Sequence, residues 1–177
     1  MKYDCLITDV DNTIADTSER MKQSLADLGR VEVFEKTSDE FGGFKEFLES
    51  KELETLWQLF LSDRYLHLDS PAPGAASFLR KLQTQGLDIF YLTGRHDEPG
   101  DSMRGGTVEW LTDHGFPDPE NEGVELFMKP RRGADDRDYK NSLLEEKISF
   151  GIIPSNAVGI GDQPYDAEVY RKNGVKP

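Results

Sequence analysis

The sequence is poor in cysteine and in long apolar stretches. Its single cysteine, Cys5, excludes a disulfide within the chain, and its place in a short apolar run favours a buried, reduced thiol. No apolar stretch approaches the roughly 20 residues that a membrane-spanning helix needs. The sequence also shows no signal-peptide pattern. We therefore expect a soluble, cytoplasmic protein that does not act at a membrane.

Positive charge is scarce as well. The 21 lysines and arginines face 34 acidic residues, which gives a formal net charge of −13. A general nucleic-acid-binding protein needs a cationic surface, so this balance argues against that class. It leaves open a local phosphate site, because a metal ion or a few cationic side chains can set the charge of one pocket.

Short apolar runs alternate with segments of helical spacing along the 177 residues. Buried strands are predicted at residues 5–8, 88–92, 124–128 and 157–160. Helices are predicted at residues 20–28, 75–82, 139–148 and 166–172, and from 107 onward, while 96–106 and 129–138 are predicted as loops. This alternation predicts a parallel sheet with right-handed crossovers. The fold class is therefore α/β, a Rossmann-like parallel sheet flanked by helices.

One long segment interrupts the alternation. Residues 16–70 look mainly helical and predict a small cap inserted into a catalytic core that is formed by residues 1–15 and 71–177. The large side chains of this segment, Phe44, Phe47, Trp57 and Phe60, are interpreted first as the interior of the cap and only second as a surface for substrate stacking. We also expect a further strand to begin near Val175.

Polar residues follow the predicted strands at the points where chemistry collects in open α/β sheets. The candidates are Asp9, Asp11, Thr93, Lys140, Asp162 and Asp166. Two carboxylates that are two residues apart in extended chain share a side, and such close negative charges call for a cation or a shared proton. Because Mg²⁺ prefers oxygen ligands, the set predicts a magnesium and phosphate site at one edge of the sheet.

These segments resemble the motifs of the haloacid dehalogenase superfamily of phosphohydrolases. Asp9-Val10-Asp11-Asn12-Thr13 resembles the first motif, Leu92-Thr93-Gly94-Arg95 the second, Lys140 the third, and residues 161–166 the fourth. The resemblance covers nearly the whole chain except residues 16–70. Around the third motif, the stretch from Met128 to Lys140, together with Arg104 and Thr107, also resembles the phosphatase domains of polynucleotide end-processing enzymes.

The resemblance implies covalent chemistry at the first motif. Asp9 would be the nucleophile and form an aspartyl phosphate, and Asp11 would be the general acid and then the base for hydrolysis. The second aspartate favours phosphate chemistry over dehalogenation, because the dehalogenases of the superfamily lack it. Thr93 would bind the transferring phosphoryl group.

The resemblance also implies a substrate and metal shell. Gly94, Arg95 and Lys140 would contribute to substrate binding, although Arg95 is equally suited to pairing with a surface carboxylate. Magnesium would be bound by Asp9, the backbone carbonyl of Asp11, Asp162 and Asp166, the last directly or through water. Lys140 is preferred as the lysine of the third motif, with Lys129 as the alternative and Lys147 too far into its helix.

The function predicted from these residues is an Mg²⁺-dependent phosphatase that acts on a phosphorylated small molecule. The end of a nucleic acid stays possible as a substrate, but the net charge of −13 disfavours it. Three alternatives stay open at this point: a phosphate-binding or interaction module without turnover, a phosphomutase of the same superfamily, and a phospho-receiver domain. The last is the least suited, because its phosphorylated aspartate lies on a middle strand.

Overall fold

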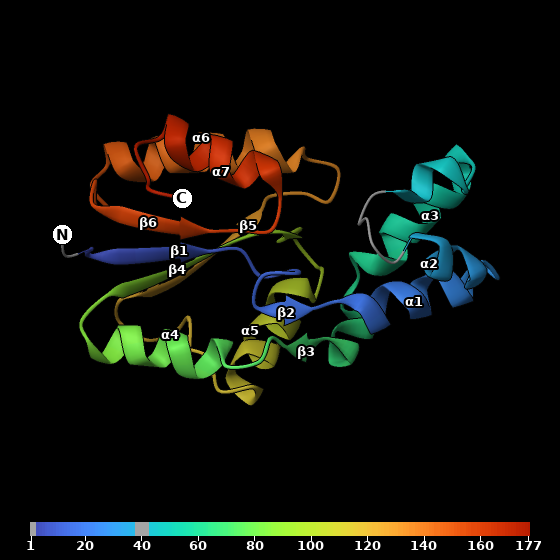
Figure 1. Ribbon diagram of the computed structural model, residues 1–177, viewed down its shortest axis with the longest axis horizontal. Coiled ribbons are helices and arrows are strands. Elements are labelled where there is room, and N and C mark those ends of the chain that lie inside the picture. Colours follow the sequence, from blue (N-terminus) through green and yellow to red (C-terminus); the bar gives the residue numbers. More distant parts are fainter. Residues whose placement is uncertain (1–2, 38–42) are drawn as a thin grey trace.

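A parallel four-stranded sheet forms the centre of the computed structural model, which describes residues 3–37 and 43–177 (Figure 1). Residues 38–42 of the predicted cap lie outside the described residues. The strands β1 (Cys5–Thr8), β4 (Asp88–His96), β5 (Val124–Lys129) and β6 (Ala157–Ile160) follow the order β5-β4-β1-β6. The predicted α/β class is therefore confirmed.

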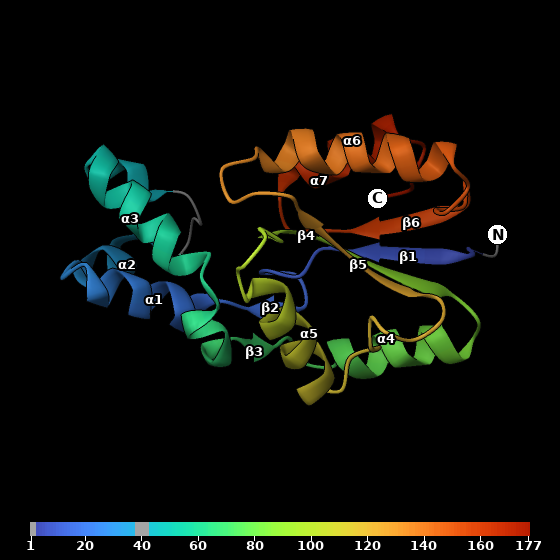
Figure 2. The same cartoon turned by 180° about the vertical axis from the view of Figure 1, so that it is seen from behind.

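Helices cover both faces of this sheet. Figures 1 and 2 show α4 (Ala75–Thr84) and α5 (Met103–Asp113) on one face, and α6 (Asp136–Ser149) and α7 (Pro164–Lys172) on the other. A sheet covered on both faces needs apolar side chains at nearly every strand position. This explains why the strands read as continuous apolar runs in the sequence.

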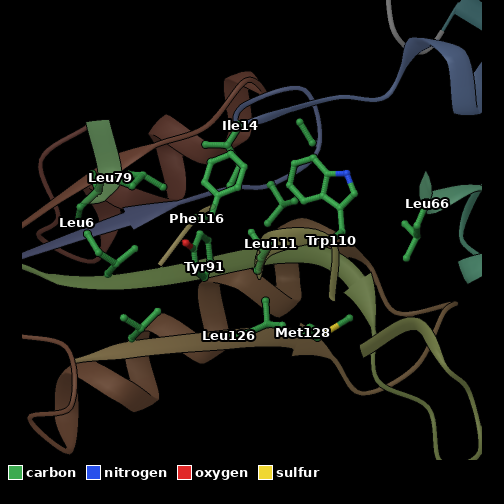
Figure 3. Packing of buried hydrophobic residues seen from close by; sticks show 14 of the residues in the cluster. Leu6, Ile14, Leu66, Leu79, Tyr91, Trp110, Leu111, Phe116, Leu126 and Met128 are labelled. Carbon is green, nitrogen blue, oxygen red and sulfur yellow. The ribbon is translucent and has the colours of Figure 1, made fainter. Parts of the chain in front are cut away.

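Alternate strand residues serve two separate apolar clusters. Leu6 and Tyr91 point toward α4 and α5, where they join Leu111, Leu126 and other buried residues (Figure 3). Cys5, Ile7, Phe90 and Leu92 point the other way and join Leu144, Val169 and Tyr170 beneath α6 and α7. The period of two along each strand thus fixes which side chains hold each helical layer.

The segment between β1 and α4 folds around its own apolar cluster. The short strands β2 (Ala15–Asp16) and β3 (Ser70–Pro71) pair antiparallel at its two ends. Between them lie α1 (Ser18–Asp27), α2 (Glu32–Thr37), η1 (Gly43–Glu46), α3 (Ser50–Phe60) and η2 (Asp63–Leu68). Its buried side chains include Met21, Leu25, Val33, Phe44, Leu56 and Phe60. Figure 1 shows these helices beyond the carboxyl-terminal edge of the sheet.

Some element boundaries differ from the prediction: α5 and α6 begin earlier than predicted, and β4 ends later. The predicted loop at 96–106 is wrong from Met103 onward, because Asp101 accepts a hydrogen bond from the Met103 amide (2.8 Å) and α5 begins there. The predicted loop at 129–138 likewise ends early. Asp135 caps α6 by accepting from the Asp138 amide at 2.9 Å. β4 runs on to His96, with a register shift after Thr93.

Two smaller expectations concern the chain's end and membranes. Lys176 forms a parallel bridge with Val158, so extended pairing begins beside β6 as expected near Val175. None of the helices in the described chain combines the length and apolar character that a bilayer crossing requires.

Candidate active site

The first strand delivers Asp9 to the carboxyl-terminal edge of the sheet. Register pairs Thr8 with Tyr91 on one side and with Ile160 on the other. The Asp9 amide continues this pairing by donating to the Ile160 carbonyl at 2.9 Å. The Asp9 side chain is buried, and its Oδ1 accepts from the Val10 amide at 2.8 Å. This contact leaves Oδ2 directed at Lys140.

Lys140 is the cation that faces Asp9. Its ammonium lies 3.1 Å from Oδ2 of Asp9 and 2.8 Å from Oδ1 of Asp166, and its side chain is buried. Burial disfavours the charged ammonium, but the charges of Asp9 and Asp166 outweigh it and hold the pKa of Lys140 above its usual range. Lys140 is therefore expected to carry its positive charge at neutral pH.

The competing lysine of the sequence analysis lies elsewhere in the site. Lys129 pairs with Asp136 and donates to the Ala134 carbonyl at 3.1 Å, so it fixes the loop before α6. Lys147 pairs with Glu146. Lys140 thus contacts Asp9, whereas Lys129 contacts Asp136 and the loop before α6.

Three carboxylates converge beside this lysine. One oxygen from each of Asp9, Asp162 and Asp166 lies within 4.8 Å of the others. Asp166 is held by a reciprocal capping box with Gln163 at the start of α7. Gly161 makes room for it, because a Cβ at that position would lie 2.3 Å from Oδ2 of Asp166. Local structure thus gathers the acidic groups that the sequence placed after β1 and β6.

The charge around Asp9 fits a divalent cation. Burial raises the pKa of Asp9 to about 7; the nearby charges of Asp166 and Asp11 add to this effect and Lys140 opposes it. Burial also raises the pKa of Asp162. A cation among these oxygens would relieve the excess of negative charge, and an all-oxygen donor set suits Mg²⁺. The residues present could therefore hold this metal.

Asp11 lies in a different electrostatic setting. Its carboxylate forms ion pairs with Arg20 and, at 2.7 Å, with Arg95. Both arginines also contact Asp69, at 2.9 Å from Arg20 and 2.8 Å from Arg95. Burial alone would raise the pKa of Asp11, but Arg95 and Arg20 outweigh it and hold that pKa below its ordinary range. Asp11 is therefore ionised in this arrangement.

A cavity of about 670 Å³ opens above these groups. Asp9, Asp11 and Asp162 line one side of it. The helical segment contributes aromatic and apolar side chains, namely Phe44, Leu53, Trp57, Phe60 and Leu61. The end of the loop before α6 and the first turn of α6 add residues 134–137 to the lining. The cavity can hold a molecule with an apolar part whose phosphate reaches Asp9.

No model of a known protein family matches the sequence. A proposed phosphatase from Clostridium difficile superposes with a TM-score of 0.70 at 15% identity, over 99% of this chain and 83% of that one. A haloacid dehalogenase-like family hydrolase from Streptococcus pneumoniae gives 0.65 at 14% identity, over 98% and 82%. The chain has the haloacid dehalogenase fold.

A sequence relative matches over a shorter region. A proposed nucleotidase from Bacillus cereus is 33% identical over 101 residues, which are 57% of this chain and 43% of the relative. This chain thus matches less than half the length of that relative. The haloacid dehalogenase fold itself confirms the resemblance seen in the sequence at the level of architecture.

Within this fold, the three residues Thr93, Gly94 and Arg95 have different surroundings. Thr93 is buried and its hydroxyl accepts from the Arg95 amide at 3.2 Å. Gly94 lines the cavity, where a Cβ would collide with the Asp136 carboxylate at 2.5 Å. Arg95 is not among the described residues that line the cavity, and its guanidinium turns to Asp11 and Asp69. It pairs with carboxylates, one of the two roles expected for it, although these carboxylates are largely buried.

Sequence reasoning missed Arg20 and Asp69, two members of the group around Asp11. One signal for Arg20 was available. It shares the buried stripe of α1 with Met21, Ser24 and Leu25, where a charged side chain calls for a partner. Asp69 carried no such signal, because it precedes a proline-rich turn in which aspartate is common.

Proposed function

We propose that the protein is an Mg²⁺-dependent phosphatase that hydrolyses phosphomonoesters through a phosphoaspartate at Asp9. The observation that carries this proposal is the contact of Lys140 with both Asp9 and Asp166, with the Asp162 carboxylate beside them. Asp9, the proposed nucleophile, and Asp162, a proposed metal ligand, line one cavity, and Lys140 contacts Asp9 and Asp166 from the buried side. The haloacid dehalogenase fold supports the same assignment.

In the first step, a carboxylate oxygen of Asp9 attacks phosphorus, and the bond from phosphorus to the substrate oxygen breaks. Lys140 holds Asp9 and attracts the phosphoryl oxygens. Asp11 gives its proton to the departing oxygen. When bound, Mg²⁺ supplies positive charge to the phosphoryl group, and Asp9, Asp162, Asp166 and the Asp11 carbonyl are the groups proposed to hold it.

In the second step, water attacks the phosphorus of phospho-Asp9 and releases inorganic phosphate. Asp11 accepts the proton of this water. The two arginines keep Asp11 in the ionised form that this step needs. For the first step the proton would lie on Oδ2 of Asp11, whose contact is Nε of Arg95 at 3.2 Å, while Oδ1 keeps its contacts with Arg20 and with Nη2 of Arg95.

The cavity favours a substrate with a planar apolar part, such as a nucleoside monophosphate. Trp57 and Phe60 meet edge to face, with ring centroids 5.8 Å apart, on the wall formed by the helical segment. Aromatic side chains of this kind stack on planar rings. Asp135, Asp136 and Arg137 supply polar groups at the start of α6. The name of the Bacillus cereus relative, a proposed nucleotidase, agrees with this class.

The test is release of inorganic phosphate from a panel of nucleoside monophosphates, sugar phosphates and p-nitrophenyl phosphate, with Mg²⁺ or with EDTA. We expect Mg²⁺-dependent turnover, with nucleoside monophosphates the best substrates. Asp9→Asn should abolish turnover while its circular dichroism spectrum stays that of the wild type. Retained turnover in Asp9→Ala would contradict the covalent mechanism, and turnover of sugar phosphates alone would contradict the substrate class.

A further inference from the structure

The side chain of Asp11 is held from several parts of the chain. Arg20 comes from the first turn of α1, Asp69 precedes β3, and Arg95 belongs to β4. Each arginine contacts both aspartates. We name these four residues, Asp11, Arg20, Asp69 and Arg95, the arginine–aspartate network. The network is a closed arrangement in which no carboxylate depends on a single arginine.

Burial makes this arrangement rigid. The side chains of Arg20, Asp69 and Arg95 are 0% exposed, and only Asp11, at 18%, reaches the cavity. Buried ion pairs contribute little net stability, but removing one partner leaves an uncompensated charge. The network is therefore a costly way to stabilise the fold and an effective way to fix the direction of one carboxylate.

Further contacts fix the arginines and Asp69 themselves. Arg95 donates to the Thr107 hydroxyl at 3.2 Å, and the Trp110 indole donates to the Asp69 carbonyl at 3.1 Å, so α5 supports the network. The guanidinium of Arg20 lies 4.2 Å from the centroid of the Phe60 ring. Through Phe60, the network also contacts the end of α3 in the helical segment. These supports leave the Asp11 carboxylate little freedom to rotate.

We propose that Arg20, Arg95 and Asp69 are positioning residues, which aim the Asp11 carboxylate at the substrate oxygen that leaves phosphorus. This inference rests on the proposed phosphatase function. The three residues act through Asp11, the one member of the network that lines the cavity. The consequence is specific: their loss impairs the transfer of a proton to the leaving group more than the attack of Asp9 on phosphorus.

A pair of matched esters separates these two effects. p-Nitrophenyl phosphate releases a stable aryloxide that needs no proton, whereas p-nitrobenzyl phosphate releases an alkoxide that does. The two esters are similar in bulk and carry the same ring. The ratio of their kcat/KM values reports only the steps up to loss of the alcohol, so hydrolysis of the shared phosphoaspartate does not enter it.

The experiment measures this ratio for Arg20→Lys, Arg95→Lys and Asp69→Asn. Lysine keeps the charge of arginine but loses its two-pronged geometry. We expect kcat/KM for the benzyl ester to fall at least about tenfold more than for the nitrophenyl ester, since a positioned general acid contributes about 10²–10⁴-fold. Arg30→Lys is the matched control and should leave the ratio unchanged, because Arg30 pairs with Glu32 and Glu52 on the helical segment.

A double variant tests whether the effect passes through Asp11. In an Asp11→Asn background, Arg95→Lys should cause no further change in the ratio. Thermal unfolding identifies any variant that fails to fold, and Arg20→Lys and Asp69→Asn then carry the test. An equal loss with both esters in folded variants would overturn the positioning role and leave the phosphatase proposal standing. Absence of Mg²⁺-dependent turnover in the wild type would instead overturn both.

Discussion

Three carboxylates face a single ammonium around Asp9, whereas two carboxylates face two guanidinium groups around Asp11. The first group has an excess of negative charge and includes the exposed Asp162, so it can take up a cation. The second is balanced and mostly buried, so it can hold a side chain in place. Two carboxylates only two residues apart in the sequence thus lie in opposite electrostatic surroundings.

The largest expected effect is on turnover. Asp9→Asn removes the proposed nucleophile and should lower the rate of phosphate release at least about 10³-fold, as the loss of a covalent catalyst does in other hydrolases. Asp113→Asn, on the exposed surface of α5, is the control and should keep full activity. Residual activity in Asp9→Asn within tenfold of the wild type would remove the functional difference between Asp9 and Asp11.

The second effect is on stability and concerns the group around Asp11, in which the positive and negative charges balance. Arg95→Leu leaves Asp11 and Asp69 with one arginine and should lower the free energy of unfolding by about 3–5 kcal/mol. Asp162→Asn, in the group around Asp9, should change the free energy of unfolding by less than about 1 kcal/mol. Urea unfolding of both variants measures the contrast. Equal stability of the two would show that the network does not depend on its charge balance.

The third effect is a pH dependence of stability in EDTA. Burial raises the pKa of Asp9 from an ordinary 3.8 to about 7, so the folded protein holds a proton that the unfolded chain has lost over this interval. The wild type therefore loses stability as the pH rises from 4 to 7, by at most about 4 kcal/mol. Asp9→Asn should not show this loss of stability, because asparagine does not ionise.

Urea unfolding at two pH values measures this third effect. The stability of Asp9→Asn relative to the wild type should grow by about 3 kcal/mol between pH 5 and pH 8. Mg²⁺ should reduce the difference, because it binds the ionised wild-type site. A difference that stays constant with pH would contradict the raised pKa and the excess of negative charge around Asp9.

The smallest effect is on metal affinity. Asp162→Asn replaces one proposed metal-binding carboxylate and should raise the Mg²⁺ concentration for half-maximal activity by about tenfold or more. Asp69 belongs to the arginine–aspartate network around Asp11, so Asp69→Asn should leave this concentration unchanged. Titration of Mg²⁺ against phosphate release gives both values. A shift in Asp69→Asn as large as that in Asp162→Asn would show that the groups around Asp9 and Asp11 both determine the affinity for Mg²⁺.

Much of the acidic group around Asp9 was predictable from the sequence. Asp9 and Asp162 follow buried strands, and the edge of a parallel sheet brings such positions together. The network around Asp11 was not predictable, because its partners come from the helical segment and its return to the core. The position of Arg20 opposite Asp11 depends on how α1 packs, and no periodicity in the sequence records that packing. Arg95 was predictable as a residue of the site, but its partners were not.

The most direct test of the account is the chemical state of Asp9 during turnover. The protein is mixed with Mg²⁺ and a nucleoside monophosphate, quenched in acid within milliseconds to seconds, digested, and analysed by mass spectrometry. We predict a peptide with one added phosphate on Asp9, formed before inorganic phosphate appears and absent from Asp9→Asn. Phosphate release by the wild type with Asp9 unmodified at every time would contradict the account.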